Sequence, residues 1–262
     1  MKTEKDQNMN ASLQNKVALV TGGTSGIGEA LAFALAKRGA KIVVAGRREN
    51  EGRSVVNAIE KRGGKGLFVK TDVSREADVK ALVDKTLATF GRLDFAFNNA
   101  GIEGTAGLTT DKQTEENYRH TFDINVLGVL LSMKYEIPVI LKNGGAIVNT
   151  SSVVGQVGMP GVGVYAASKH AVNGLTRSAA LEIAKQGVRV NAVAFGTIQT
   201  PMVNRMVGAA QTDNAQRDWL TGLQPIGRMG TTEEAAQAVI ALLENPYITG
   251  SILTVDGGWT AQ

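Results

Sequence analysis

The chain has 262 residues, of which 43% are hydrophobic and 20% charged, with a formal net charge of +4 and no cysteine. This length suits one large α/β domain or two small ones, and a single domain of this size buries roughly 70–75% of its unfolded surface. The absence of cysteine excludes disulfides and thiolate zinc sites, while scattered positive charges and the lack of a ~18–20-residue apolar run argue against nucleic acid and membrane partners.

The first 15 residues are polar and lack the apolar centre of a signal peptide. We therefore expect a disordered tail over residues 1–15 and a single domain over 16–262. A chain without cysteine is compatible with a reducing compartment, and we expect a cytoplasmic protein.

Short apolar runs alternate with longer helical patterns through the whole domain. Such runs are typical of strands buried on both faces of a parallel sheet. Strands are predicted at 16–21, 41–45, 66–70, 93–97, 145–150, 188–194 and 251–255, and helices at 29–38, 50–61, 74–90, 115–141, 164–185 and 231–243. The alternation predicts an α/β fold with a doubly wound parallel sheet.

A glycine cluster, Gly22, Gly23, Gly26 and Gly28, separates the first strand from the first helix. The amides at a helix N-terminus attract an anion, and glycine lets a pyrophosphate approach the backbone. We interpret this turn as a phosphate cradle, although its spacing is Gly-x-x-x-Gly-x-Gly and a plain turn is the alternative.

The residues that end the next strands refine the nucleotide hypothesis. NAD-specific folds keep an acid after the second strand, for the ribose 2′-hydroxyl, but this chain has Gly46, Arg47 and Arg48 there. Two cations favour a 2′-phosphate and hence NADP(H), with NAD(H) possible if the arginines only form a solvated turn. Asp72 follows the third strand, where it can meet an adenine amino group, cap the next helix, or do both.

Tyr165 and Lys169 stand four residues apart in a predicted helix and so share one face of it. A free tyrosine has a pKa near ~10, and we expect the Lys169 ammonium to lower the pKa of Tyr165. Ser152 lies at the end of the fifth strand, before a loop that can fold back to place its hydroxyl beside the phenol. A surface Tyr/Lys pair is the alternative for this spacing taken alone.

Other polar positions are open to two interpretations. Asn98 and Asn99 follow the fourth strand and suggest either backbone positioning beside a ligand or a plain turn. Asn125 lies on an apolar stretch. Considered alone, this position favours a structural residue with satisfied hydrogen bonds over a catalytic residue. The long Met-rich segment 196–228 is typical of a lid over a substrate. His120 and His170 show no metal-ligand pattern, so no metal site is predicted.

The chain resembles the short-chain dehydrogenase/reductase family over nearly its whole length after residue 15. The matching pieces are Thr21-Gly22-x-x-x-Gly26-x-Gly28, Asn98-Asn99-Ala100-Gly101, Asn125, Ser152, Tyr165-x-x-x-Lys169 and Asp256-Gly257-Gly258. The resemblance implies a single Rossmann-type domain with seven strands in the order 3-2-1-4-5-6-7, assembled as a homotetramer. It also implies a catalytic tetrad of Asn125, Ser152, Tyr165 and Lys169.

The cofactor contacts that the resemblance implies come from the glycine turn, the following strand ends, the catalytic helix and the segment after the sixth strand. They are Gly22, Thr24, Ser25, Gly26, Ile27, Gly28, Gly46, Arg47, Arg48, Asp72, Val73, Asn99, Ala100, Gly101, Tyr165, Lys169, Gly196, Ile198 and Thr200.

The implied activity is NAD(P)H-dependent interconversion of a carbonyl and a secondary alcohol, with Tyr165 as the general acid/base and a small-molecule substrate. The alternatives are an NAD-dependent sugar or secondary alcohol dehydrogenase, a 3-oxoacyl-[acyl-carrier-protein] reductase, and a non-catalytic nucleotide sensor that would need neither Tyr165 nor Ser152. We expect an apolar pocket, formed by Val153, Val154, Val157, Phe195, Met202 and Met206.

Two positions depart from the family pattern. Phe195 stands where the family usually has proline, so its ring either lines the substrate pocket or packs into the core. Ser25 occupies a place where many NADP-using relatives carry a cation, which counts against NADP(H).

Overall fold

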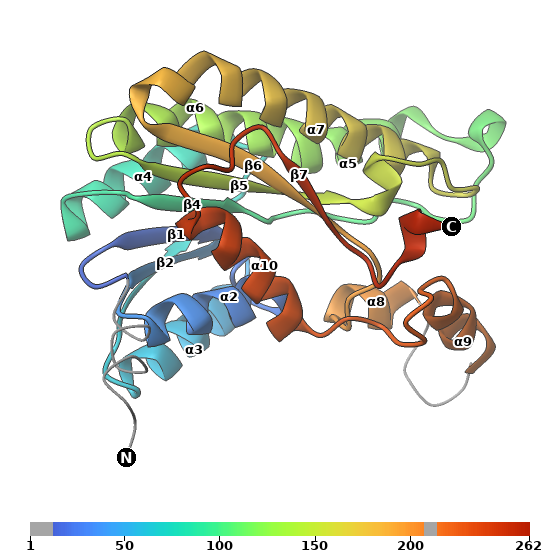
Figure 1. The fold of residues 1–262 in the computed structure, drawn as a ribbon, viewed down its shortest axis with the longest axis horizontal. Helices are drawn as coiled ribbons and strands as arrows, with labels where there is room; N and C mark the ends of the chain where they lie inside the picture. The colour runs from blue at the N-terminus through green and yellow to red at the C-terminus, as the bar shows by residue number, and fades with distance from the viewer. Residues whose placement is uncertain (1–12, 207–213) are drawn as a thin grey trace.

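The computed structural model describes residues 13–206 and 214–262. Its centre is one parallel sheet of seven strands in the order β3-β2-β1-β4-β5-β6-β7, as predicted (Figure 1). The strands are β1 Val17–Thr21, β2 Lys41–Gly46, β3 Lys65–Lys70, β4 Phe95–Asn98, β5 Gly145–Ser152, β6 Val188–Phe195 and β7 Ile252–Val255.

Helices cover both faces of this sheet (Figure 1). On one face lie α2 Gly26–Lys37, α3 Glu49–Glu60 and α10 Thr232–Glu244, and on the other lie α4 Glu76–Phe90, α5 Glu115–Phe122, α6 Gly128–Ile140 and α7 Gly163–Ile183. Two further helices, α8 Pro201–Met206 and α9 Asn214–Gly222, lie beside the sheet (Figure 1).

Each buried strand supplies side chains to two cores, one on each face of the sheet. In β1, Val17 and Leu19 join one core while Ala18 and Val20 join the other, and all four are at most 1% exposed. Successive side chains of a strand point to opposite faces, so a strand covered on both sides has to be apolar throughout. This explains why the strands appear in the sequence as unbroken apolar runs.

The structure differs from the sequence-based prediction at three places. The helix expected over 115–141 is interrupted by a π-helical turn, Asp123–Leu127. The predicted lid over 196–228 contains α8 and α9, and its residues 207–213 lie outside the described residues. Residues 1–12 of the predicted tail also lie outside, but Leu13 is buried (3% exposed) and its amide donates to Arg38 O at 3.2 Å. Leu13 therefore packs with the domain, although the prediction counted it in the tail.

None of the helices in the described part of the chain is long and apolar enough to cross a membrane.

Candidate active site

The carboxyl ends of strands β1 to β6 meet at one edge of the sheet, where they border a cavity of about 870 Å³. In open α/β sheets this edge is where ligands bind. The predicted site residues that line the cavity are Gly22, Thr24, Ser25, Gly26, Ile27, Gly46, Arg47, Arg48, Asp72, Val73, Asn99, Ala100, Gly101, Ser152, Tyr165, Lys169, Gly196, Ile198 and Thr200. Gly28 and Asn125 do not line it.

The glycine turn ends β1 and opens α2. Gly22 and Gly26 have positive φ values of 64° and 59°, which favour glycine. A Cβ on Gly28 would lie 2.5 Å from Gly22 O, so this glycine lets the turn fold tightly onto the helix. Ser25, the N-cap residue of α2, makes no side-chain cap, and the first amides of the helix are left without a side-chain acceptor. The turn therefore fits the phosphate groups of a dinucleotide.

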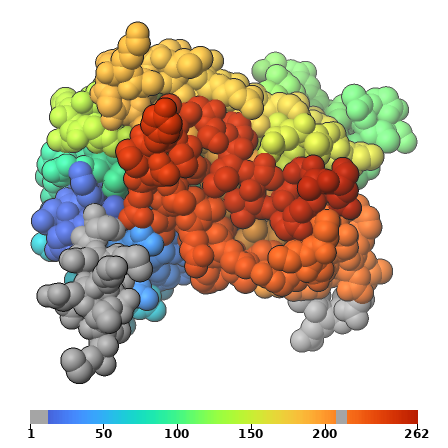
Figure 2. Space-filling model, viewed as in Figure 1, coloured from blue at the N-terminus to red at the C-terminus, as the bar shows by residue number. Residues whose placement is uncertain are grey.

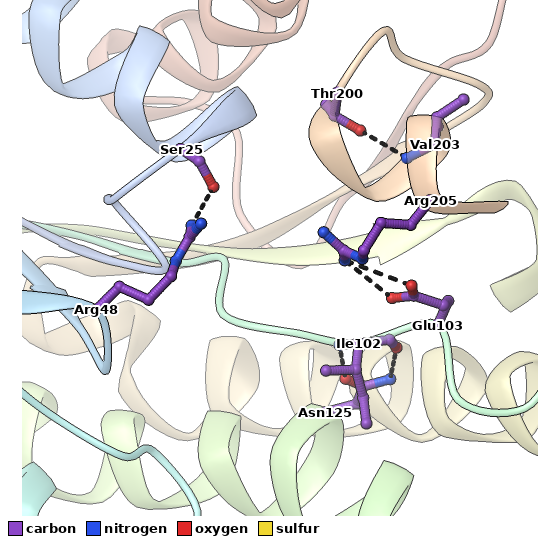
Figure 3. A network of polar contacts seen from close by, with 8 residues as sticks. All are labelled: Ser25, Arg48, Ile102, Glu103, Asn125, Thr200, Val203 and Arg205. Carbon is purple, nitrogen blue, oxygen red and sulfur yellow. Dashed lines mark hydrogen bonds and ion pairs between the residues drawn. The ribbon is translucent and has the colours of Figure 1, made fainter. Parts of the chain in front are cut away.

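Two arginines lie beside the same turn. Arg48 Nη2 donates to Thr24 Oγ1 at 2.9 Å. It also donates to Ser25 Oγ at 2.5 Å, as Figure 3 shows, and Arg47 lines the same cavity. A Cβ on Gly46 would lie 2.8 Å from Thr24 Cγ2, so the space for an acidic side chain there is already occupied. The end of β2 is therefore cationic, with no acid available from position 46.

The segment after β4 is fastened to the glycine turn by asparagine. The Asn99 N–H donates to Thr21 Oγ1 at 3.0 Å, and Asn99 Nδ2 lies 3.2 Å from both Thr21 O and Gly22 O. Asp72 accepts from the Ser74 amide and hydroxyl, at 3.1 and 2.7 Å, while also lining the cavity. Asn99 thus positions backbone beside the cavity, and Asp72 orders the turn before α4.

Three side chains from β5 and α7 meet on the cavity wall. The Ser152 hydroxyl donates to Phe195 O at 3.4 Å, and it also acts on the Tyr165 phenol, whose pKa it lowers. Lys169 Nζ donates to Thr150 O at 2.8 Å and lies 5.6 Å from the centre of the Tyr165 ring. The predicted serine, tyrosine and lysine are therefore assembled as one group.

The electrostatics of this group differ from the prediction. Burial raises the pKa of Tyr165 to about 12, the Ser152 hydroxyl opposes that rise, and the Glu103 carboxylate adds to it. Burial also lowers the pKa of Lys169 to about 8. The expectation that the pKa of Tyr165 is lowered is wrong for this structure, because burial disfavours the phenolate and the Lys169 ammonium donates to Thr150 O.

Asn125 lies in the π-helical turn and is fully buried. Its Oδ1 accepts from Ile102 N, and its Nδ2 donates to Ile102 O, both at 2.9 Å (Figure 3). Nδ2 also donates to Ser168 Oγ at 3.1 Å. A Cβ on Gly101 would lie 3.1 Å from Asn125 Oδ1 and 3.7 Å from Lys169 Nζ, so the amide stands close to the lysine, behind the cavity wall.

The sequence analysis missed several polar residues of the cavity. Glu103, Asn117, His120 and Arg205 all line it. Glu103 follows the Asn-Asn-Ala-Gly segment directly after Ile102, so the strand-end argument used for that segment could have included it. Arg205 had no such signal, because its position depends on how α8 packs.

The prediction of an apolar pocket is wrong for most of its residues. Only Phe195 and Met202 of its six residues border the cavity. Val153 and Val154 are at most 4% exposed and pack in a separate apolar cluster with Ala166. Phe195 is 5% exposed and belongs to the core between the sheet and helices α2 and α10, so it packs mainly in the core although it also borders the cavity.

Comparisons with known proteins agree with the fold and identify the family. A family model described as enoyl-(acyl carrier protein) reductase matches residues 22–260. A 2,5-dichloro-2,5-cyclohexadiene-1,4-diol dehydrogenase of Sphingobium indicum is 46% identical over 255 residues, covering 96% of this chain and 99% of the relative. A cyclohexanol dehydrogenase of an Acinetobacter species is 42% identical over 257 residues, covering 97% and 98%. The crystal structure of levodione reductase superimposes with a TM-score of 0.91 at 35% identity, covering 95% and 99%.

Proposed function

The chain belongs to the short-chain dehydrogenase/reductase family and interconverts carbonyls and secondary alcohols, and we propose that its substrates are alcohols and ketones on six-membered carbon rings. Two relatives named for such ring alcohols support the substrate class, since each is more than 40% identical along almost the entire chain.

The observation that carries the proposed chemistry is the group formed by Ser152, Tyr165 and Lys169 on the wall of the cavity that also contains the glycine turn. A nucleotide-sensing protein would need the turn but not this group. We therefore assign the three side chains to catalysis, with Asn125 as a positioning residue behind them.

In this proposal the phenol of Tyr165 gives its proton to the forming alkoxide during reduction and takes the hydroxyl proton during oxidation. The Ser152 hydroxyl, which lines the same cavity as that phenol, holds the substrate oxygen beside it. The nicotinamide cofactor supplies the hydride chemistry when bound. A pKa near 12 keeps Tyr165 protonated at neutral pH, ready for reduction, and any cation that binds beside the phenol lowers that value and favours oxidation.

Replacing Tyr165 with phenylalanine tests the assignment, because the change removes only the phenolic oxygen. We expect turnover of cyclohexanol, with NAD⁺ or NADP⁺, to fall by at least ~10²-fold while cofactor binding persists. Tyr247→Phe is the matched control, since Tyr247 is 98% exposed and does not line the cavity. Near-normal turnover by Tyr165→Phe would remove this residue from the mechanism.

The cofactor is NADP(H) rather than NAD(H) in this proposal. Support comes from Arg48, whose guanidinium donates to Ser25 Oγ at 2.5 Å. Arg48 therefore brings a positive charge to position 25, where many NADP-using relatives carry a cation and this chain has serine. Arg47 lies on the same cavity wall, and position 46 offers no acid for a ribose 2′-hydroxyl. An Arg guanidinium suits a 2′-phosphate through its planar fork of donors.

Binding measurements with NADPH, NADP⁺, NADH and NAD⁺ test this assignment. We expect NADPH to bind at least several-fold tighter than NADH, and Arg47→Ala and Arg48→Ala each to erase much of the difference. Arg53→Ala is the control, because Arg53 pairs with Glu49 on α3 and does not line the cavity. A preference for NADH in the unmodified protein would show that the arginines only form a solvated turn.

The absence of cysteine from the sequence is consistent with a cytoplasmic enzyme, and we keep that location as part of the proposal.

A further inference from the structure

An ion pair joins two walls of the cavity that the proposed reaction leaves without a role. Arg205 Nη2, on α8, lies 3.4 Å from both carboxylate oxygens of Glu103, in the segment between β4 and α5 (Figure 3). Both residues line the cavity, and the side chains are 59% and 23% exposed, respectively. The pair therefore bridges the cavity between elements that are about a hundred residues apart in the sequence.

Glu103 is held in place by the residue before it. Both backbone groups of Ile102 are bonded to the Asn125 amide at 2.9 Å. The same amide donates to Ser168 Oγ, and the Ser168 hydroxyl donates to Tyr165 O at 2.6 Å. A contiguous set of contacts thus runs from α8 through Glu103 and Asn125 to the helix turn that carries Tyr165.

Charge connects the two sites more directly. Burial is the main cause of the raised pKa of Tyr165, and the Glu103 carboxylate raises it further. The titratable and charged residues lining the cavity are Arg47, Arg48, Asp72, Glu103, Glu116, His120, Tyr165, Lys169 and Arg205. Arg205 pairs with Glu103 on the lining of the same cavity, so its positive charge opposes the field of the carboxylate at the phenol.

We propose that Glu103 and Arg205 form a latch that couples the position of α8 over the cavity to proton transfer at Tyr165. With α8 in place, the latch has no net charge, and the phenol can ionise more easily. When Arg205 moves away, the Glu103 carboxylate remains alone and disfavours the phenolate. Both are positioning residues, because they act through Tyr165, and the inference rests on the proposed function.

Charge-removing variants test the latch through the pH dependence of cyclohexanol oxidation, in which the phenolate takes up the proton. For Arg205→Gln the midpoint of log kcat/KM against pH should rise by roughly half a unit or more, since the carboxylate is left unpaired. For Glu103→Gln it should fall by a comparable amount, because a cation remains alone. The double variant restores a neutral latch and should return close to the midpoint of the unmodified enzyme.

Three controls separate charge from structure. Glu103→Asp and Arg205→Lys keep the charges and should keep the midpoint. Arg228→Gln removes an ion pair with Glu234 that lies outside the cavity and should leave the midpoint unchanged. Because exposed ion pairs contribute little to stability, thermal melting of all these variants should stay close to that of the unmodified protein.

The latch is overturned if the midpoints of the two single variants do not move or move in the same direction. A spectrophotometric titration of the phenol, corrected with the Tyr165→Phe variant, makes the same comparison without turnover. These two measurements distinguish a failure of the proposed function from a failure of the latch. If the unmodified enzyme does not oxidise cyclohexanol but the phenol titrations of the two single variants shift in opposite directions, the proposed substrate is rejected. If the enzyme turns over normally and the titrations do not shift, the latch is rejected.

Discussion

Glu136 is a buried carboxyl group of α6, with an exposed fraction of 1%. One of its oxygens accepts from Asn98 Nδ2 at 3.0 Å, and the same nitrogen donates to Asn149 Oδ1 at 3.0 Å. Burial raises the pKa of Glu136 to about 7, and the hydrogen bond from Asn98 only partly offsets this. The side chain therefore lies in the core with its charge disfavoured.

The raised pKa makes the stability of the protein depend on pH. Between the ordinary value of 4.5 and about 7, the folded state keeps a proton that the unfolded state has released. The contribution of Glu136 is thus fully present below pH 4.5, is lost as the pH rises to about 7, and stays lost above it.

Glu136→Gln should remove this dependence, because glutamine keeps the shape but does not titrate. Relative to the unmodified protein, the variant should gain stability as the pH rises from 5 to 8, by up to roughly 3 kcal/mol for a shift of this size. Chemical denaturation at both pH values measures the gain. Glu60→Gln on the exposed face of α3 is the control. The prediction would be contradicted if Glu136→Gln and the unmodified protein differed by the same free energy of unfolding at both pH values.

At the scale of elements, predictions succeeded where local chemistry alone determines the structure. The helix expected from Thr231 has a capping box, in which the Thr231 hydroxyl accepts from Glu234 N and the Glu234 carboxylate accepts from Thr231 N. The ends of β1 and β5 fall where apolar runs give way to glycine or serine, which is why the glycine turn and Ser152 were correctly placed.

Features that depend on packing between distant elements could not be predicted. The π-helical turn around Asn125 requires partners in Ile102 and Ser168, which lie on other elements. The pKa of Tyr165 depends on the burial of its ring, which the spacing of Tyr165 and Lys169 does not encode. Likewise, Arg205 enters the cavity only because α8 folds over it.

At the scale of the whole molecule, exposed apolar side chains and an open sheet edge mark candidate partner surfaces on two regions of the described chain. On the helices α5 to α6, Tyr118, Leu127 and Leu130 are 50%, 36% and 46% exposed. At the edge of the sheet, all residues of β7 are only half-buried, and Figure 2 shows the C-terminal part of the chain at the front of the molecule. Exposed apolar side chains and uncovered strand edges are typical of partner surfaces.

Two distinct surfaces of this kind favour a tetramer over a dimer. A two-fold axis at each surface pairs it with itself, and two such axes together generate four copies. We therefore propose a homotetramer, with one interface along the helices α5 and α6 and the other along β7.

Sedimentation velocity at micromolar concentration tests this assembly. The unmodified protein should sediment as a tetramer, and Leu130→Glu should yield dimers, because it places a charge in the interface of α5 and α6 while the β7 interface persists. Asn57→Glu introduces the same charge on the exposed face of α3, on the opposite side of the sheet, and should leave the tetramer intact. A stable monomer of the unmodified protein would reject the assembly, and a tetramer of Leu130→Glu would reject the helical interface, because a carboxylate buried there without a partner carries a large desolvation cost.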